Sequence, residues 1–227
     1  MDRLTIAAGD HIGLMGTTRS GKTVLSRQLL AAVQRGIVID PKFEFPAPGV
    51  SARSEGWRVD FHLYPWWKTF RVIWRPRRID DERLSNLIRL AWKRKNLVLY
   101  VDELQSLTDF FPASTATLAD VIRTGASRRV SVWWSAQRPY WVPRQFISEA
   151  HHKFVFTLVD EDDRDRAAKF VGPRAKVEMP MHDFLYRRVG MTDPVQATFN
   201  MKTKRIEPRE GAGLEAGPLS YSREPAS

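Results

Sequence analysis

The stretch GLMGTTRSGKTVLSRQLL, Gly13 to Leu30, sets the architecture because it contains the pattern Gly16-x-x-x-x-Gly21-Lys22-Thr23. This spacing is typical of a phosphate-binding loop, in which glycines let consecutive backbone N–H groups turn toward phosphate oxygens. The apolar residues before the loop predict a buried strand, and those after it recur at helical spacing. A loop in this position places phosphates at the positive end of the following helix.

The loop predicts a nucleotide site with ATP and Mg²⁺ as cofactors. We expect Lys22 to act in catalysis by reaching the β- and γ-phosphates, and Thr23 to ligate Mg²⁺. The predicted nucleotide-binding residues are Gly16, Thr17, Thr18, Arg19, Ser20, Gly21, Lys22 and Thr23. The alternative interpretation is a plain glycine turn.

Two other strands end in polar side chains. LVLYVDE, residues 97–103, predicts a buried strand that ends in Asp102 and Glu103. Aspartate for the metal and glutamate as the base that polarises water suit ATP hydrolysis. VSVWWSAQ ends in Gln137, whose amide would point into the crevice at the carboxyl ends of parallel strands, to sense the γ-phosphate or position water. The alternatives are two surface acids at a strand end and a polar turn residue.

The rest of the chain alternates strands with helices. Strands are predicted at 37–40, 70–74, 97–103, 130–137 and 153–160, helices at 81–95, 114–127 and 160–172, and a closing hairpin at 183–200. This order predicts an α/β fold with a mostly parallel central sheet and helices on both faces. Residues 1–201 are expected to form one ATPase domain. Residues 202–227 are rich in Gly, Pro and charge and predict a disordered tail.

Composition narrows the function classes. The 227 residues include no cysteine, which excludes disulfides and thiolate chemistry. No apolar run reaches the length of a membrane span, so we expect a soluble, cytoplasmic protein. With 36 Lys and Arg against 26 Asp and Glu, the net charge of +10 favours a polyanionic partner over mere solubility. The basic residues cluster at 71–78, at 93–95 and at 123–129.

Two further segments carry a family resemblance. IDPKFEF, Ile39 to Phe45, resembles the aspartate-proline-lysine-x-glutamate signature of the HerA–FtsK superfamily, and residues 123–139 resemble its segment running into a sensor glutamine. With the loop, the acidic pair and Gln137 in the expected order, the resemblance spans about Gly13 to Asp160. It implies a RecA-like fold and a hexameric or pentameric ring ATPase that moves double-stranded DNA. It gives Asp40, Lys42 and Glu44 no individual role.

One departure concerns the arginine finger, the cation that a neighbouring subunit contributes to the site. Many members of the superfamily carry an arginine directly after the glycine before the sensor strand, whereas Ala126 follows Gly125 here. Arg123 and Arg128 are the predicted fingers, with Arg129 a further candidate. The alternative is that they are solvated charges at a helix end.

The length of the chain favours one kind of DNA pump. It reaches its loop by Gly16 and ends soon after the predicted hairpin, so it resembles the minimal genome-packaging ATPases of tailless, membrane-containing viruses. A capsid vertex protein is then an expected partner, and the host cytoplasm or the virion vertex the expected location. A mobile-element or bacterial transfer motor is the alternative within the superfamily. A nucleotide-dependent assembly switch that never contacts DNA is the alternative from another class.

Overall fold

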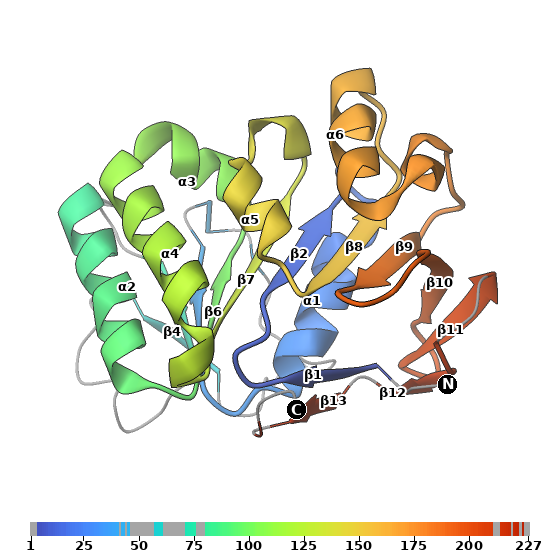
Figure 1. Cartoon of the computed structure of the whole chain (residues 1–227). Helices are drawn as coiled ribbons and strands as arrows, with labels where there is room; N and C mark the ends of the chain where they lie inside the picture. The colour runs from blue at the N-terminus through green and yellow to red at the C-terminus, as the bar shows by residue number, and fades with distance from the viewer. Residues whose placement is uncertain are drawn as a thin grey trace.

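The computed structural model describes residues 4–40, 42–43, 45, 57–60, 71–75, 80–210, 214–218, 220–222 and 224. A sheet in the order β12-β11-β10-β9-β8-β2-β7-β6-β3-β5-β4 runs through the molecule, and β1 and β13 pair separately (Figure 1). The strands are β1 (Thr5–Ala7), β2 (Ile12–Met15), β3 (Gly36–Ile39), β4 (Arg58–Asp60), β5 (Arg71–Trp74), β6 (Leu97–Val101), β7 (Val130–Ala136), β8 (His152–Phe156), β9 (Asp183–Arg188), β10 (Val195–Asn200), β11 (Arg205–Glu210), β12 (Gly217–Pro218) and β13 (Ser220–Ser222). The helices are α1 (Lys22–Ala31), α2 (Asp81–Arg94), α3 (Leu104–Phe110), α4 (Pro112–Thr124), α5 (Arg144–Ser148) and α6 (Glu161–Val171).

The strands from β8 to β4 are all parallel, as the alternation of strands and helices predicts. Successive residues of these strands pack into two different hydrophobic clusters. Leu97, Leu99 and Val101 of β6 belong to one cluster, and Val98 and Tyr100 belong to the other. Side chains of a strand alternate between faces, so a strand that is apolar on both faces is buried on both.

Helices cover both faces of this parallel region, which confirms the predicted fold class (Figure 1). Buried residues of α2, α3, α4, α5 and α6 all join one cluster, whereas those of α1 join the other. Helix α2 begins where the sequence indicates, because the Asp80 side chain accepts a hydrogen bond from the N–H of Arg83 at 2.8 Å. Within the described residues, no helix is both long and apolar enough to cross a membrane.

The predicted disordered tail is wrong for the residues that form β11, β12 and β13. Strand β11 extends the β9–β10 hairpin, and its Ile206 is opposite Phe199 and buried. Strand β13 pairs with β1, and Tyr221 lies edge-on to Trp133 with ring centroids 5.9 Å apart. A few apolar side chains are enough here because β11 and β12 add to an existing sheet edge and β13 pairs with β1. The average composition of residues 202–227 does not reveal where the few apolar side chains of the segment lie.

Candidate nucleotide site

The phosphate-binding loop joins β2 to α1 at the carboxyl edge of the sheet. Gly16 and Gly21 have φ of 155° and 114°, in the region that favours glycine, and Gly21 directly precedes the helix. A Cβ on Gly16 would lie 2.6 Å from the Cβ of Phe156, so even alanine would force the loop off β8. Gly16 is therefore explained by close packing against β8, and Gly21 by its left-handed backbone at the start of α1.

Lys22 lies in the mouth of this loop and is almost completely buried. Its ammonium donates to the carbonyl oxygens of Gly16 at 2.6 Å and Thr17 at 2.8 Å. Burial lowers the pKa of Lys22 to about 8, and the nearby carboxylates of Glu103 and Asp102 oppose that shift. The lysine thus remains mostly charged at neutral pH, next to the backbone that would surround a phosphate.

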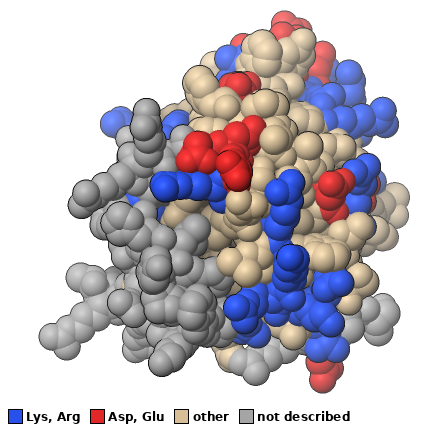
Figure 2. Space-filling model, turned by 90° about the vertical axis from the view of Figure 1, so that its left-hand side faces the viewer, with Lys and Arg blue, Asp and Glu red and all other residues tan. Residues whose placement is uncertain are grey.

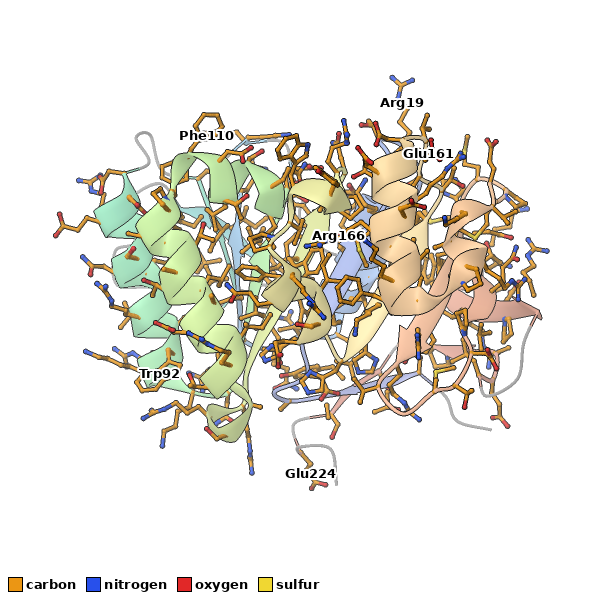
Figure 3. The ribbon with its side chains drawn as sticks, turned by 45° about the horizontal axis from the view of Figure 1, so that its top comes forward. Arg19, Trp92, Phe110, Glu161, Arg166 and Glu224 are labelled. Atoms are coloured by element: carbon orange, nitrogen blue, oxygen red, sulfur yellow. The ribbon has the colours of Figure 1, made fainter. Side chains whose placement is uncertain are left out.

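The remaining loop side chains divide into exposed and buried groups. Thr18, Arg19 and Thr23 are exposed, and Arg19 points away from the molecule at the tip of the loop (Figure 3). The hydroxyl of Ser20 is buried and has no hydrogen-bond partner among the described residues. Thr17 is held by the residue that follows β8, because its backbone N–H donates to the carbonyl of Thr157 at 3.0 Å. An unpartnered buried hydroxyl beside Lys22 fits a loop shaped for an oxyanion.

Asp102 follows β6, and its carboxylate helps to keep the pKa of Lys22 from falling further. Its Oδ1 accepts from the hydroxyls of Ser135 at 2.8 Å and Tyr100 at 3.2 Å. Burial raises the pKa of Asp102 to about 6, and the neighbouring Glu103 carboxylate adds to the rise. A divalent cation would favour the ionised form of such a carboxyl.

Glu103 is buried and has left-handed backbone angles, with φ of 57° and ψ of 63°, at the residue before α3. Such a conformation costs free energy for a non-glycine residue and is common at functional sites. Its Oε1 accepts from the Gln137 amide at 2.8 Å, and the Gln105 amide donates to its Oε2. The structure therefore brings the predicted base and the predicted sensor glutamine into direct contact.

Ser135 is a site residue that the sequence analysis missed, as are Tyr100 beside Asp102 and Gln105 beside Glu103. The Ser135 hydroxyl donates to Asp102 and accepts from the backbone N–H of Glu103 at 3.1 Å, so it holds both acids in place. The signal was present, because Ser135 precedes Gln137 by two residues and side chains two apart on a strand lie on one face. A buried polar residue next to tryptophans in a central strand needs a partner.

The residues present fit a magnesium ion that keeps most of its water. The described residues contain no cluster of three or more His, Asp or Glu side chains arranged to hold a metal. Mg²⁺ commonly takes one or two protein ligands beside substrate phosphates and water, so the Asp102 carboxylate and the Thr23 hydroxyl would be enough to hold it.

The resemblance gave Asp40 no role, and the structure shows its contacts. Asp40 follows β3 and is fully buried. Its Oδ2 accepts from the Arg75 side chain at 2.7 Å and from the backbone N–H of Phe45 at 3.0 Å. Arg75 is thereby paired with a buried carboxylate, and only 20% of its side chain is exposed. Lys42 is exposed, and Glu44 lies outside the described residues.

The two predicted arginine fingers lie away from their own chain's loop. Arg128 comes before β7 and Gln137 comes after it, so the strand's seven residues, roughly 24 Å at about 3.4 Å each, separate them. Arg123 pairs with Asp120 on α4, and the Arg128 guanidinium lies 3.7 Å from the ring centroid of Trp92. Neither residue reaches the nucleotide site of its own chain. The same is expected of an arginine finger, which acts in the site of a neighbouring subunit.

A mostly parallel sheet with helices on both faces, a phosphate-binding loop after β2 and paired acids two strands away is the fold of the P-loop NTPases, of the RecA-like kind. No protein-family model matches the chain. The chain is 30% identical over 93 residues to the DNA packaging ATPase P9 of Enterobacteria phage PRD1. That match covers 41% of this chain and 39% of P9.

Solved structures share the fold over most of the chain. The genome packaging NTPase B204 of Sulfolobus turreted icosahedral virus 2, in complex with AMPPCP, aligns with a TM-score of 0.61 at 15% identity, over 91% of this chain and 100% of that one. B204 of Sulfolobus turreted icosahedral virus gives 0.63 at 16% identity, over 90% and 98%. The ATPase EssC of Geobacillus thermodenitrificans gives 0.58 at 12% identity, over 82% of this chain and 38% of that one. The chain thus resembles viral genome-packaging ATPases.

Proposed function

We propose that this protein is an ATP-driven translocase of double-stranded DNA that packages a viral genome into a preformed capsid. The observation that carries the proposal is the contact of Glu103 with Gln137, two strands from a loop that holds Lys22 between its carbonyls. P9 and B204, which the chain resembles, are named for packaging DNA or genomes. The basic net charge supports a polyanion as the cargo.

Each side chain has a distinct part in hydrolysis. ATP with Mg²⁺ supplies the phosphoryl group that is transferred to water. Lys22 and the loop N–H groups would bind and orient the phosphates, and Thr23 and Asp102 would hold the metal. Glu103 would accept the proton of the attacking water, and Gln137, whose amide donates to the Glu103 carboxylate, would sense the γ-phosphate. Electrostatic interactions between these buried groups and the phosphates are strong because little water screens them.

Glu103→Gln is expected to retain ATP binding and to lower the hydrolysis rate by about 10²–10⁴-fold, because an amide keeps the shape but cannot accept a proton. Fluorescent-nucleotide titration and phosphate release measure the two quantities. Glu161→Gln is the matched control, since that carboxylate is exposed at the start of α6 (Figure 3). Normal turnover by the Glu103 variant would show that Glu103 is not the catalytic base.

The partners follow from the same proposal. We propose a homo-oligomeric ring, a hexamer or pentamer, because the arginine that completes each site must come from a neighbouring subunit. The ring would dock on a capsid vertex protein and act in the host cytoplasm or at the virion vertex. A mobile-element or bacterial transfer motor would use the same site, and the neighbouring genes distinguish them. Capsid genes support packaging, whereas relaxase or secretion genes support transfer.

DNA-dependent ATP hydrolysis tests the proposal. Duplex DNA is expected to raise ATP turnover, equally for unrelated sequences, because a motor must contact phosphates and not bases. The stimulation is expected to fall steeply between low and physiological salt as counterions compete. Turnover that duplex DNA leaves unchanged would favour the nucleotide-dependent assembly switch, and a marked preference for one sequence would indicate a specific DNA-binding protein.

A further inference from the structure

Four neighbouring strands of the parallel region begin along the edge of the sheet opposite the phosphate-binding loop. Strands β7, β6, β3 and β5 lie side by side in that order. Backbone hydrogen bonds join the starts of three of these strands. The N–H groups of Asn96 and Leu97 donate to the carbonyls of Arg128 and Arg129 at 3.1 Å, and the N–H of Val98 donates to the carbonyl of Arg35 at 3.0 Å. Segments far apart in the sequence therefore form one continuous border.

Each of these strands is preceded by basic residues or starts with one. Residues 93–95 end α2 before β6, residues 128–129 precede β7, Arg35 precedes β3, and Arg71 starts β5. Lys93, Arg94, Lys95 and Arg129 are exposed. We call Arg35, Lys93, Arg94, Lys95, Arg128 and Arg129 the basic edge. Lysine and arginine gather on the lower part of the face that Figure 2 shows, which includes the exposed side of α2.

The basic edge also contains a cavity of about 270 Å³, lined by Ala8, Gln34, Arg35, Asn96, Arg129 and Tyr221. Two arginines and two residues with carboxamide side chains line this cavity, and their N–H groups can donate hydrogen bonds to an anion. The space accommodates a phosphodiester group, because a water molecule takes about 30 Å³ in the liquid. Arginine forks match phosphate oxygens in pairs.

Acidic residues are missing from the segments that make up this border. None occurs at 34–36, 93–97 or 126–130. The exposed acidic residue Glu224 is next to the lining residue Ala8, since its backbone carbonyl accepts a hydrogen bond from the N–H of Ala8 at 3.3 Å. A run of cations with no interspersed carboxylates attracts a polyanion and repels a basic surface.

We propose that the basic edge binds the phosphate backbone of the DNA duplex on which the proposed motor acts, with one phosphate in the cavity beside Arg35 and Arg129. The inference rests on the proposed function. Strands about 4.8 Å apart make the four-strand border about 15 Å wide. One DNA strand presents a phosphate every 3.4 Å or so along the helix axis, so the border spans about four phosphates.

The experiment compares two triple variants that remove the same charge. Lys93, Arg94 and Lys95 changed to glutamine remove three exposed charges from the basic edge. Lys202, Lys204 and Arg205 changed to glutamine remove three exposed charges at the β10–β11 turn. The two variants also match in backbone conformation, because each includes one lysine with a positive φ, Lys95 at 58° and Lys204 at 56°. Binding of 50-base-pair duplexes of two unrelated sequences is measured from 50 to 200 mM salt.

The basic-edge variant is expected to bind at least about tenfold more weakly, with the slope of log affinity against log salt reduced by about three, while the control variant binds as wild type does. Both variants are expected to keep the wild-type ATPase rate without DNA, since none of the six residues belongs to the nucleotide site. Wild-type binding and slope in the basic-edge variant would overturn the inference and leave the proposed motor standing. Wild-type protein that binds no duplex would instead overturn the proposed function. If only binding to an acidic capsid protein is lost, the edge contacts protein and the inference fails.

Discussion

Lys22→Ala is expected to abolish ATP turnover, with a loss of at least about 10³-fold. The ammonium lies between the carbonyls of Gly16 and Thr17 and is the one buried cation in the loop. A methyl group cannot carry the charge that stabilises the phosphate oxygens during transfer, where electrostatic contacts contribute most. Steady-state ATPase assays and nucleotide titration measure the effect.

Two controls separate this loss from unfolding. Lys169→Ala removes a lysine from α6, away from the loop, and is expected to be neutral. The thermal unfolding midpoint shows whether the Lys22 variant remains folded. We expect it to remain folded, because burial of the Lys22 ammonium costs solvation free energy that the variant does not lose. Full ATPase activity of a folded Lys22→Ala protein would contradict the nucleotide site itself.

Arg123→Ala is expected to lower the ATPase rate of the assembled ring by about 10³–10⁵-fold, the contribution of an arginine finger. Such a finger supplies a cation that faces the γ-phosphate while its negative charge shifts during transfer. Arg123 is exposed at the end of α4, beyond the reach of its own chain's loop, so only a neighbouring subunit's site can receive it. Asp120→Ala is the matched control, because it removes the ion-pair partner of Arg123 and keeps the arginine.

Mixing subunits tests whether the arginine acts between chains. Arg123→Ala subunits mixed with Lys22→Ala subunits, each inactive alone, form some interfaces with an intact loop and an intact arginine. Partial activity is therefore expected to return. A mixture that assembles but stays inactive, or an active Arg123→Ala ring, would exclude Arg123. Arg128, held over Trp92, would then be the next residue to change.

The central part of the fold was predictable because local signals agreed there. The loop glycines, the strands that are apolar on both faces and the Asp80 cap each depend on neighbours in sequence. The same holds for Asp102, Glu103 and Gln137, since polar residues at the ends of adjacent parallel strands meet at one edge. Their meeting point is the contact between Glu103 and Gln137.

The contacts that depend on long-range packing were not predictable. The Ser135 hydroxyl links two acids from another strand, and Arg75 pairs with Asp40 from a strand 35 residues earlier. Strand β11 forms on the open edge of β10, and β13 pairs with β1 in a separate two-stranded sheet. The composition of the tail does not indicate either partner. Three basic clusters were visible in the sequence, but only the sheet register shows that 93–95 and 128–129 share a border, while Arg75 turns inward.

Movement of the protein along DNA tests the central proposal most directly. A short oligonucleotide bound as a third strand on a long duplex is released when a translocase passes it, and its release is followed by fluorescence. Wild-type protein is expected to release the third strand with ATP, and Glu103→Gln protein is expected to leave it in place although it still binds ATP. Wild-type protein that hydrolyses ATP on the duplex yet never releases the third strand would contradict the account.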